Sequence, residues 1–234
     1  MDSPEEQPQE NQLGTLYKNS LAKSFLSKVY AWMSLSMLVT VGVALYGSRN
    51  EELIGWVLDH FLMLGITTLV IVCIMSLAAR RLSSKALAVL LIVFAAMEGI
   101  FFGPVLLVYT QQTLTLAFAC TAGTFGVMAL YGALTKRNLS PWGGALFMIL
   151  AGLIIASIAN IFWGNGTLDL ILCYGGVLLF AIYTAYDTQK ILEAGVALTG
   201  EDRNKAAILG ALDLYLDFIN LFVHILRILS RYND

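Results

Sequence analysis

The sequence has little charge for its length. Only 13% of its 234 residues are charged, whereas about a quarter are charged in a typical soluble domain. This scarcity, with a mean hydropathy of +0.75, excludes a soluble globular protein and indicates that most of the chain lies in a lipid bilayer. The sequence also lacks a basic tract of the kind that binds nucleic acid, so nucleic acid is not expected as a partner.

Cysteine and histidine are also scarce. The three cysteines, Cys73, Cys120 and Cys173, stand singly inside apolar runs, where a free thiol behaves as a small hydrophobe. Their odd number and the lack of a CxxC pair argue against a disulfide framework. The two histidines, His60 and His224, are too few for a zinc site. We therefore expect no resident cofactor.

Seven apolar runs, each close to the about 20 residues that cross a bilayer as a helix, follow one another along the chain. They cover residues 25–46, 56–79, 86–109, 113–134, 142–163, 168–191 and 206–229. The sequence predicts an all-α polytopic membrane protein, with one seven-helix domain over residues 24–234. Residues 1–23 are polar and lack the apolar core of a signal peptide, so we expect a disordered cytoplasmic tail there.

The distribution of basic residues predicts the orientation. With the N-terminus in the cytoplasm, the basic residues on or near the inner side would be Lys18, Lys23, Lys28, Arg80, Arg81, Lys85, Lys136, Arg137, Lys190, Arg203 and Lys205. Only Arg49, Arg227 and Arg231 would lie outside, so the positive-inside rule favours this orientation. The last two arginines leave an alternative open, in which the final segment is re-entrant and six helices span.

Small residues predict where helices approach one another closely. Gly99 and Gly103 form a GxxxG pair. The pairs Gly175–Gly176 and Gly123/Gly126 are further candidates.

The last apolar run carries a regular polar stripe. Within AAILGALDLYLDFINLFVHILRIL, the stripe residues are spaced by four, three, four and three positions: Asp213, Asp217, Asn220, His224 and Arg227. At about 100° per residue they fall within an arc of about 80° on a helix, and Tyr215 lies on the opposite side.

An acidic stripe cannot face lipid cheaply. A charged side chain at the bilayer centre costs about 2.5–3.5 kcal/mol on insertion scales, so we expect the last helix to be enclosed by the other six. An amphipathic helix on the membrane surface is the alternative. Such helices usually carry Lys and Arg on their polar face, whereas this stripe is mainly acidic.

Two further acids lie within apolar runs, Asp187 near the inner end of the sixth and Glu98 midway along the third. Because the sixth and last helices are consecutive and antiparallel, Asp187 can face the stripe. If the sixth helix ends near Lys190, Asp187 lies at a shallow depth in the membrane and its partner would be Asp213. If that helix runs on to Gly195, Asp187 lies deeper and its partner would be Asp217.

Two carboxylates in contact do not both ionise easily and titrate as a unit. The site is therefore a candidate pH sensor. Oxygen ligands also suit Ca²⁺, but a tight cage needs about six to eight of them. We expect a weak Ca²⁺ station through which the ion passes, centred on Asp187 and Asp217 and completed by Asp213 and the Asn220 amide. Asp169, at a helix end, is interpreted as a cap or a solvated residue.

The sequence around these acids resembles the Bax-inhibitor family. The motifs that carry the resemblance are Tyr186-Asp187-Thr188-Gln189, Leu214-Tyr215-Leu216-Asp217-Phe218-Ile219-Asn220-Leu221-Phe222 and Leu226-Arg227-Ile228. The stretches Leu130-Tyr131-Gly132 and Thr135-Lys136-Arg137-Asn138-Leu139-Ser140 are similar to its bacterial branch. The resemblance covers nearly the whole chain after residue 23.

The resemblance implies a seven-helix fold with the last helix enclosed, and a pH-sensitive calcium leak in which Asp187 and Asp217 form the titrating pair. It implies that Arg80 or Arg81 acts as a latch on that pair. It also implies the bacterial inner membrane as the location and, for some relatives, a membrane protease as a partner. Eukaryotic relatives are linked to suppression of cell death.

This sequence departs from the family at several positions. Its second helix has no acid between Phe61 and Ala79, where some relatives carry a glutamate, and Asp213 and Glu98 lie outside the defining pattern.

Other functions fit less well. An intramembrane aspartyl protease would have glycine directly before its second aspartate, where this chain has Leu212, and a Pro-Ala-Leu segment downstream, whereas the last proline is Pro141. We therefore do not expect an enzyme. A retinal pigment would need a lysine within the last helix, and the run over residues 206–229 has none. The alternative that stays open is a membrane protein that restrains a protease or a cell-death partner without transport.

Overall fold

The computed structural model describes the backbone of residues 6–233 and the side chains of residues 20–232. All regular elements in this part of the chain are helical: α1 Glu6–Gly47, α2 Glu51–Asp59, α3 Phe61–Leu77, α4 Ser84–Phe102, α5 Val105–Val108, α6 Gln111–Leu134, η1 Ser140–Trp142, α7 Gly143–Trp163, α8 Gly166–Ala197 and α9 Gly200–Asn233. The prediction of an all-α polytopic protein is confirmed.

Polar residues cap the N-terminal ends of four helices. The side chains of Asn50, Ser83, Thr110 and Asn165 accept hydrogen bonds from the first-turn N–H groups of α2, α4, α6 and α8, which satisfies donors that otherwise lack a partner. Gly164 ends α7 in the left-handed conformation, with φ of 61°, which costs glycine little. These caps define the helix boundaries within the apolar sequence.

Within the described residues, six helices are long and apolar enough to cross a membrane, or seven if the bent pair α2 and α3 counts as one span. The run predicted over residues 56–79 is therefore not one straight helix. The chain bends by 78° between α2 and α3, at His60, whose ring stacks on Trp56 at 4.7 Å. The third run is also broken, because α4 ends before Pro104 and the short helix α5 follows.

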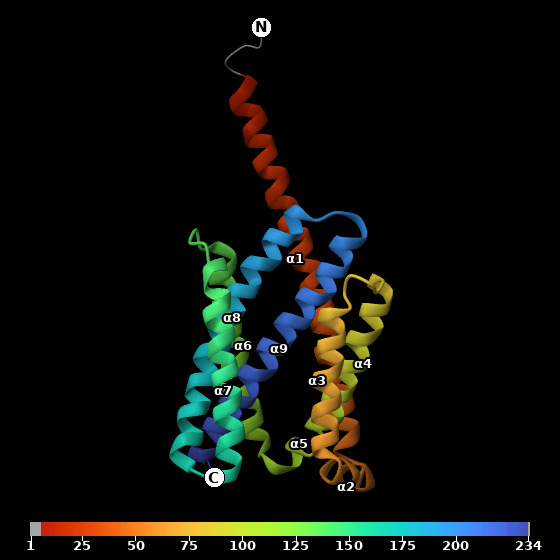
Figure 1. The fold of residues 1–234 in the computed structure, drawn as a ribbon, viewed down its shortest axis with the longest axis vertical. Helices are drawn as coiled ribbons and strands as arrows, with labels where there is room; N and C mark the ends of the chain where they lie inside the picture. Colours follow the sequence, from red (N-terminus) through yellow and green to blue (C-terminus); the bar gives the residue numbers. More distant parts are fainter. Residues whose placement is uncertain (1–5, 234) are drawn as a thin grey trace.

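The last helix crosses the whole bundle (Figure 1). α9 is one continuous helix of 34 residues, about 50 Å long at 1.5 Å per residue. The beginning of α1 and the end of α9 lie at opposite ends of the molecule, and we name these the α1 end and the C-terminal end. The re-entrant alternative for the last segment is wrong, because α9 does not turn back.

α9 is the most buried of the spans. In its apolar window 56% of the residues are buried, against 6% in α7. α1, α4, α6 and α8 pack directly against α9, whereas α3 packs on α4 and α7 packs on α8. The expected central position of the last helix is confirmed, with four of the other helices as its main direct neighbours. The alternative of a helix on the membrane surface is wrong.

The glycine predictions had mixed outcomes. A Cβ at Gly99 would lie 2.6 Å from the Thr40 carbonyl oxygen, so α1 and α4 meet there. A Cβ at Gly176 would overlap the His224 ring. Among the described residues, no atom outside the local helix backbone lies within 4 Å of a Cβ placed at Gly123 or Gly126, so neither glycine marks a close approach between helices there.

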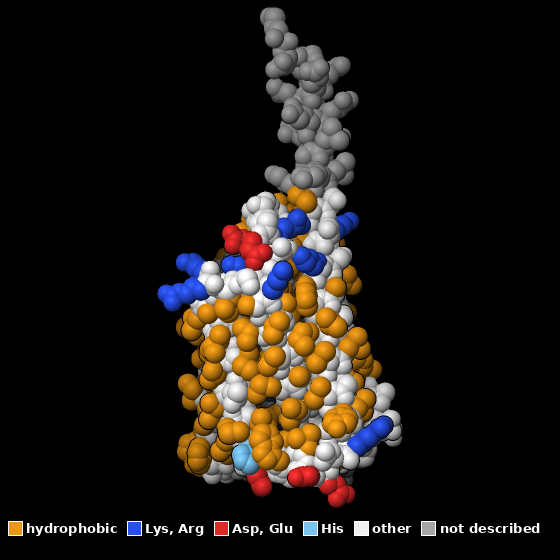
Figure 2. All heavy atoms as spheres, turned by 90° about the vertical axis from the view of Figure 1, so that its right-hand side faces the viewer, with side chains coloured by type: hydrophobic (Ala, Val, Ile, Leu, Met, Phe, Trp, Pro, Cys, Tyr) orange, Lys and Arg blue, Asp and Glu red, His pale blue; other side chains and the backbone are white. Residues whose placement is uncertain are grey.

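The predicted tail, residues 1–23, falls partly outside the described residues, because residues 1–5 are not described. α1 begins at Glu6 and passes through the predicted boundary as one helix, and the part of it that is long and apolar enough to cross a membrane is Ser20–Gly47. The surface of the bundle carries an apolar belt, and the basic side chains on the face drawn gather mostly at the α1 end (Figure 2).

Candidate functional site

The two sides of α9 have different environments. Tyr215, on the side away from the stripe, is fully buried, and its hydroxyl lies 2.8 Å from the Thr40 hydroxyl of α1. Thr40 in turn donates to the Ala95 carbonyl of α4. α9 is therefore attached to α1 and α4 on one side, and its polar stripe faces α8 and α7.

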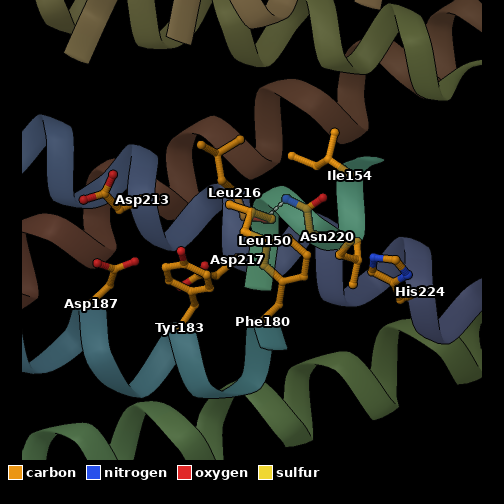
Figure 3. Close-up of a pocket in the computed structure, with 11 residues that line it drawn as sticks. Leu150, Ile154, Phe180, Tyr183, Asp187, Asp213, Leu216, Asp217, Asn220 and His224 are labelled. Carbon is orange, nitrogen blue, oxygen red and sulfur yellow. Dashed lines mark hydrogen bonds between the residues drawn. The ribbon is translucent and has the colours of Figure 1, made fainter. Parts of the chain in front are cut away.

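The stripe lines a cavity of about 360 Å³ between α7, α8 and α9. We call it the acidic cavity, because three carboxylates line it, those of Asp187, Asp213 and Asp217 (Figure 3). The other lining residues are Leu150, Leu153, Ile154, Phe180, Tyr183, Leu216, Asn220 and His224. The structure thus brings Asp187 of α8 together with four of the five predicted stripe residues.

Both residues expected as possible partners of Asp187, Asp213 and Asp217, line the same cavity as Asp187. α8 runs past Gly195 to Ala197, the condition under which Asp217 was expected, and Asp187 and Asp217 line the same cavity. A lysine connects Asp187 with Asp213: the Lys190 ammonium lies 3.6 Å from Asp187 Oδ1 and 3.3 Å from Asp213 Oδ2. Sequence reasoning assigned Lys190 only to the inner basic set. Its position three residues after Asp187, on the same helix face, was the signal that could have identified it.

Asp217 and His224 are buried without full hydrogen bonding. Asp217 is 4% exposed and His224 7% exposed, and Asp217 Oδ2 and His224 Nδ1 have no hydrogen-bond partner within the described structure. By contrast, the Asn220 amide donates to the Leu216 carbonyl of its own helix at 2.8 Å. Buried polar atoms without partners are costly, and here both belong to residues that line one cavity.

The segment after Asp187 attaches α8 to the connection between α6 and α7. The Gln189 side chain accepts a hydrogen bond from the Leu139 N–H at 2.7 Å and donates to the Arg137 carbonyl at 2.9 Å. A Cβ at Gly132 would lie 2.2 Å from the Ala185 carbonyl oxygen, so α6 and α8 touch through their backbones. The family motif that contains Asp187 and Gln189 therefore packs against the two stretches between residues 130 and 140 that resemble the bacterial branch. These contacts fix the part of α8 that carries Asp187.

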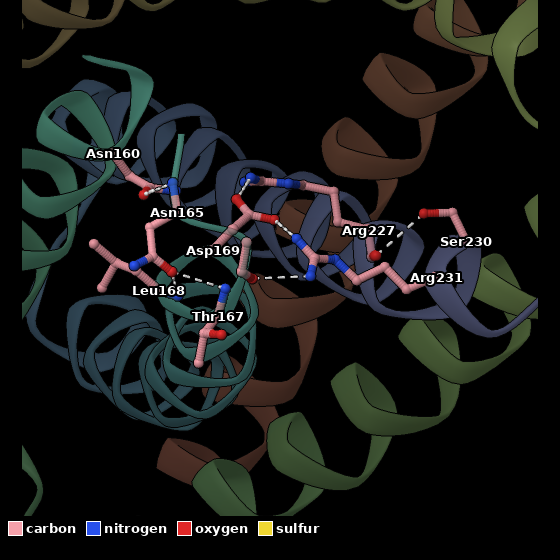
Figure 4. A network of polar contacts seen from close by, with 9 residues as sticks. Asn160, Asn165, Thr167, Leu168, Asp169, Arg227, Ser230 and Arg231 are labelled. Atoms are coloured by element: carbon pink, nitrogen blue, oxygen red, sulfur yellow. Dashed lines mark hydrogen bonds and ion pairs between the residues drawn. The ribbon is translucent and has the colours of Figure 1, made fainter. Parts of the chain in front are cut away.

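At the C-terminal end the stripe continues into an ion-pair cluster. Arg227 and Arg231 of α9 both donate to the Asp169 carboxylate of α8, and Arg231 also donates to the Gly166 carbonyl at 2.9 Å (Figure 4). We call Asp169, Arg227 and Arg231 the arginine cluster. The interpretation of Asp169 as a cap or a solvated residue is wrong, because Asn165 caps α8 and Asp169 pairs with the arginines. Asp169 and Arg227 also line a second cavity of about 320 Å³.

Two predicted candidates lie away from the acidic cavity. Glu98 is half-buried on α4 and is not among the lining residues in the described structure. Arg80 and Arg81 are exposed beyond the end of α3, and no ion pair found within the described residues includes either of them. In this conformation Lys190 is the cation that contacts Asp187.

The acidic cavity is not a formed metal cage. Among the described residues, no group of three or more His, Cys, Asp and Glu side chains is arranged to hold a metal ion. Ca²⁺ prefers about six to eight oxygen ligands. Asp187 and Asp217, the predicted weak Ca²⁺ station, would need water to complete the coordination of an ion.

Comparison with known proteins agrees with the fold and the motifs. Residues 22–234 match the family model described as inhibitor of apoptosis-promoting Bax1. The inner membrane protein YbhL of Escherichia coli strain K12 is 38% identical over 215 residues, covering 89% of this chain and 92% of YbhL. A protein of Deinococcus radiodurans is 38% identical over 207 residues, covering 88% of this chain and 90% of its own length. The protein YrjE of Lactococcus lactis is 37% identical over 216 residues, covering 88% and 89%. This chain therefore belongs to the Bax inhibitor family of membrane proteins.

Proposed function

We propose that this protein is a pH-sensitive cation leak pathway, with Ca²⁺ as the permeant ion, and that it has no catalytic activity. The observation that carries the proposal is the acidic cavity, in which the Asp187, Asp213 and Asp217 carboxylates face one ammonium. With all four groups ionised the cavity holds an excess of negative charge. Acidic side chains buried in membrane proteins are expensive, and they mark ion pathways by default.

The geometry supports a path along α9. Asp213, Asp217, Asn220 and His224 line the acidic cavity, and Arg227 lines the second cavity towards the C-terminal end. The stripe on α9 thus borders both cavities in turn. An ion that leaves the carboxylates towards this end meets Arg227, a positive charge that opposes a cation. We infer that the pathway is closed at the arginine cluster in this conformation.

The pH response follows from the ionisation of Asp187 and Asp217. The titratable or charged groups that face them are Asp213 and His224 on α9, and Lys190 and Tyr183 on α8. The residues that α7 contributes to the lining are apolar: Leu150, Leu153 and Ile154. As pH rises, ionisation of the second carboxylate adds repulsion between α8 and α9 and attraction for a cation. Flux should therefore increase with pH.

An aspartyl protease mechanism has little support at this site. Such an enzyme needs two carboxylates that share a proton and act together on one water molecule. Here Lys190 lies between Asp187 and Asp213.

We further propose the bacterial inner membrane as the location, with the N-terminus in the cytoplasm. The similarity to YbhL supports the location. The basic side chains that gather at the α1 end support the orientation.

The test is ion flux into liposomes that contain only the purified protein. We expect Ca²⁺ to enter down its gradient at a rate above that of empty liposomes. The rate should be higher at pH 8 than at about pH 5, because carboxyl groups that are buried and paired lose their protons over this range. A rate equal to that of empty liposomes at every pH would refute the proposal.

A second candidate function is that of a regulatory membrane protein that restrains another membrane protein, such as a protease or a cell-death factor. The observation that favours it is the surface of α7, since only 6% of its apolar window is buried within the chain. Large exposed side chains on this helix include Phe147, Ile155 and Phe162. Cross-linking from α7 to a defined membrane protein in cells, combined with no flux in liposomes, would favour this role.

A further inference from the structure

Lys190 holds the only positive charge that contacts the acidic cavity carboxylates in the described structure. Its ammonium lies 3.6 Å from Asp187 on the same helix and 3.3 Å from Asp213 on α9. The two carboxylates thus share one cation at the end of the cavity nearer the α1 end. An entering cation that uses these oxygens has to occupy the same position.

The three side chains differ in their exposure. The Asp187 side chain is 10% exposed, Asp213 is 36% exposed and Lys190 is 57% exposed. The carboxylate of Asp187 is therefore enclosed by protein, whereas more than half of the Lys190 side chain is not covered by protein. A lysine ammonium is a compact charge on a flexible four-carbon stem, so it can leave the carboxylates without a change in the helices.

A second observation is an acceptor atom in the same cavity that lacks a partner. Asp217 Oδ2 is buried, has no hydrogen-bond partner in the described structure and lines the same cavity. Lys190 does not reach Asp217 with an ion pair. Lys190 thus contacts two of the three acids, and the third, Asp217, has no cation within ion-pair distance in the described structure.

We propose that Lys190 is a tethered cation, which competes with the permeant ion for the Asp187 and Asp213 carboxylates and so sets the cation affinity of the cavity entrance. The proposal deepens the proposed function and rests on it. While Lys190 contacts Asp187 and Asp213, Asp217 is the only one of the three carboxyl groups that a divalent cation can bind without competition from the lysine. When Lys190 moves away from them, the ion can also bind the oxygens of Asp187 and Asp213.

The competing explanation is that Lys190 only ties α8 to α9. The two explanations differ in what Ca²⁺ should do. A structural tie predicts that removal of the lysine lowers stability and leaves Ca²⁺ binding unchanged. A competitor predicts that removal of the lysine strengthens Ca²⁺ binding.

The first experiment measures thermal unfolding of the purified full-length protein in detergent as CaCl₂ is increased at constant ionic strength. The variants are Lys190→Gln, Lys190→Arg and the control Lys136→Gln, which removes an exposed lysine in the connection after α6. We expect the half-effective Ca²⁺ concentration to fall by about fivefold in Lys190→Gln, the equivalent of ~1 kcal/mol for a partly exposed ion pair. Lys190→Arg and Lys136→Gln should stay within about twofold of the wild type. Lower stability of Lys190→Gln with an unchanged Ca²⁺ dependence would overturn the proposal.

The second experiment uses the wild-type protein alone, so it does not depend on the folding of a variant. An amine-reactive acylating reagent is added with and without Ca²⁺, and mass spectrometry compares the modification of Lys190 with that of Lys136. Displacement by Ca²⁺ should raise the modification of Lys190 relative to Lys136. An unchanged ratio at Ca²⁺ concentrations that shift the unfolding temperature would overturn the proposal.

Both experiments measure binding, so their outcome can be separated from that of the flux assay. If wild-type liposomes pass no Ca²⁺ while Ca²⁺ still displaces Lys190, the leak proposal fails and the tethered cation is supported as part of a binding site. If the wild type passes Ca²⁺ and neither binding experiment responds to Lys190, the leak proposal stands and the tethered cation is refuted.

Discussion

The acidic cavity and the arginine cluster are built from the same two helices, α8 and α9, but their charges are balanced in opposite ways. In the acidic cavity three carboxylates face the single ammonium of Lys190, and one carboxylate oxygen is buried without a partner. In the arginine cluster one carboxylate, that of Asp169, is paired with two arginines. The first region has a cavity and a carboxyl group without a full set of partners, whereas the charges of the second hold the ends of two helices together.

This contrast predicts opposite effects of the same chemical change. Loss of a carboxylate should weaken the arginine cluster and should relieve repulsion in the acidic cavity. Four predictions follow the comparison from the largest expected effect to the smallest.

Asp169→Asn should cause the largest loss of stability. The change leaves Arg227 and Arg231 half-exposed without their carboxylate, and we expect a loss of about 2 kcal/mol, below the 3–5 kcal/mol of a fully buried pair. Unfolding by SDS titration in mixed micelles measures this loss. Asp217→Asn is the matched control, because it removes a buried carboxylate that lacks a full set of partners, and it should not lower stability. Equal losses in the two variants would show that the regions do not differ as described.

Asp187→Asn and Asp217→Asn should each flatten the pH dependence of Ca²⁺ flux. In the wild type we expect flux to rise by about tenfold between pH 5 and pH 8, the effect of ~1.4 kcal/mol of added attraction for the cation. Because paired carboxylates titrate together, the double variant should add little to either single change. The measurement is the liposome flux assay at a series of pH values. If Asp213→Asn flattens the profile while Asp217→Asn does not, Asp213 is the partner of Asp187.

Tyr215→Phe tests whether the side of α9 away from the cavity is structural. The variant loses the hydrogen bond to Thr40, for which we expect a stability loss of about 1 kcal/mol. The ratio of flux at pH 8 to flux at pH 5 should stay as in the wild type. A changed ratio in a variant of unchanged stability would place Tyr215 in the pathway and would contradict the division of α9 into two sides.

Glu98→Gln should have the smallest effect. Glu98 lies on α4 outside the acidic cavity, beside the contact between Gly99 and α1, and glutamine keeps its size. We expect stability to change by less than about 0.5 kcal/mol, as at most sites away from cores and networks, and flux to change by less than about twofold. A large loss of flux in the folded variant would mean that the pathway involves α4.

Several features could be predicted because they depend on composition and periodicity alone. The low charge and the long apolar runs predict a polytopic membrane protein. The cost of an acid in lipid predicts that α9 lies inside the bundle, and the helical period separates Tyr215 from the stripe. These arguments hold for any arrangement of the neighbouring helices.

The rest depended on how neighbouring helices rotate and how far side chains reach. The bend at His60 divides the run predicted over residues 56–79, and the polar residues Asp59 and His60 do not by themselves predict a change of direction of 78°. Lys190 meets Asp213 only because α8 and α9 present these faces to each other, and Asp169 meets two arginines that lie about 60 residues further along the chain. Periodicity fixes which residues share a face of one helix, but it does not fix which face of the next helix they meet. Only the packed structure decides which charges are paired and which are left free in the cavity.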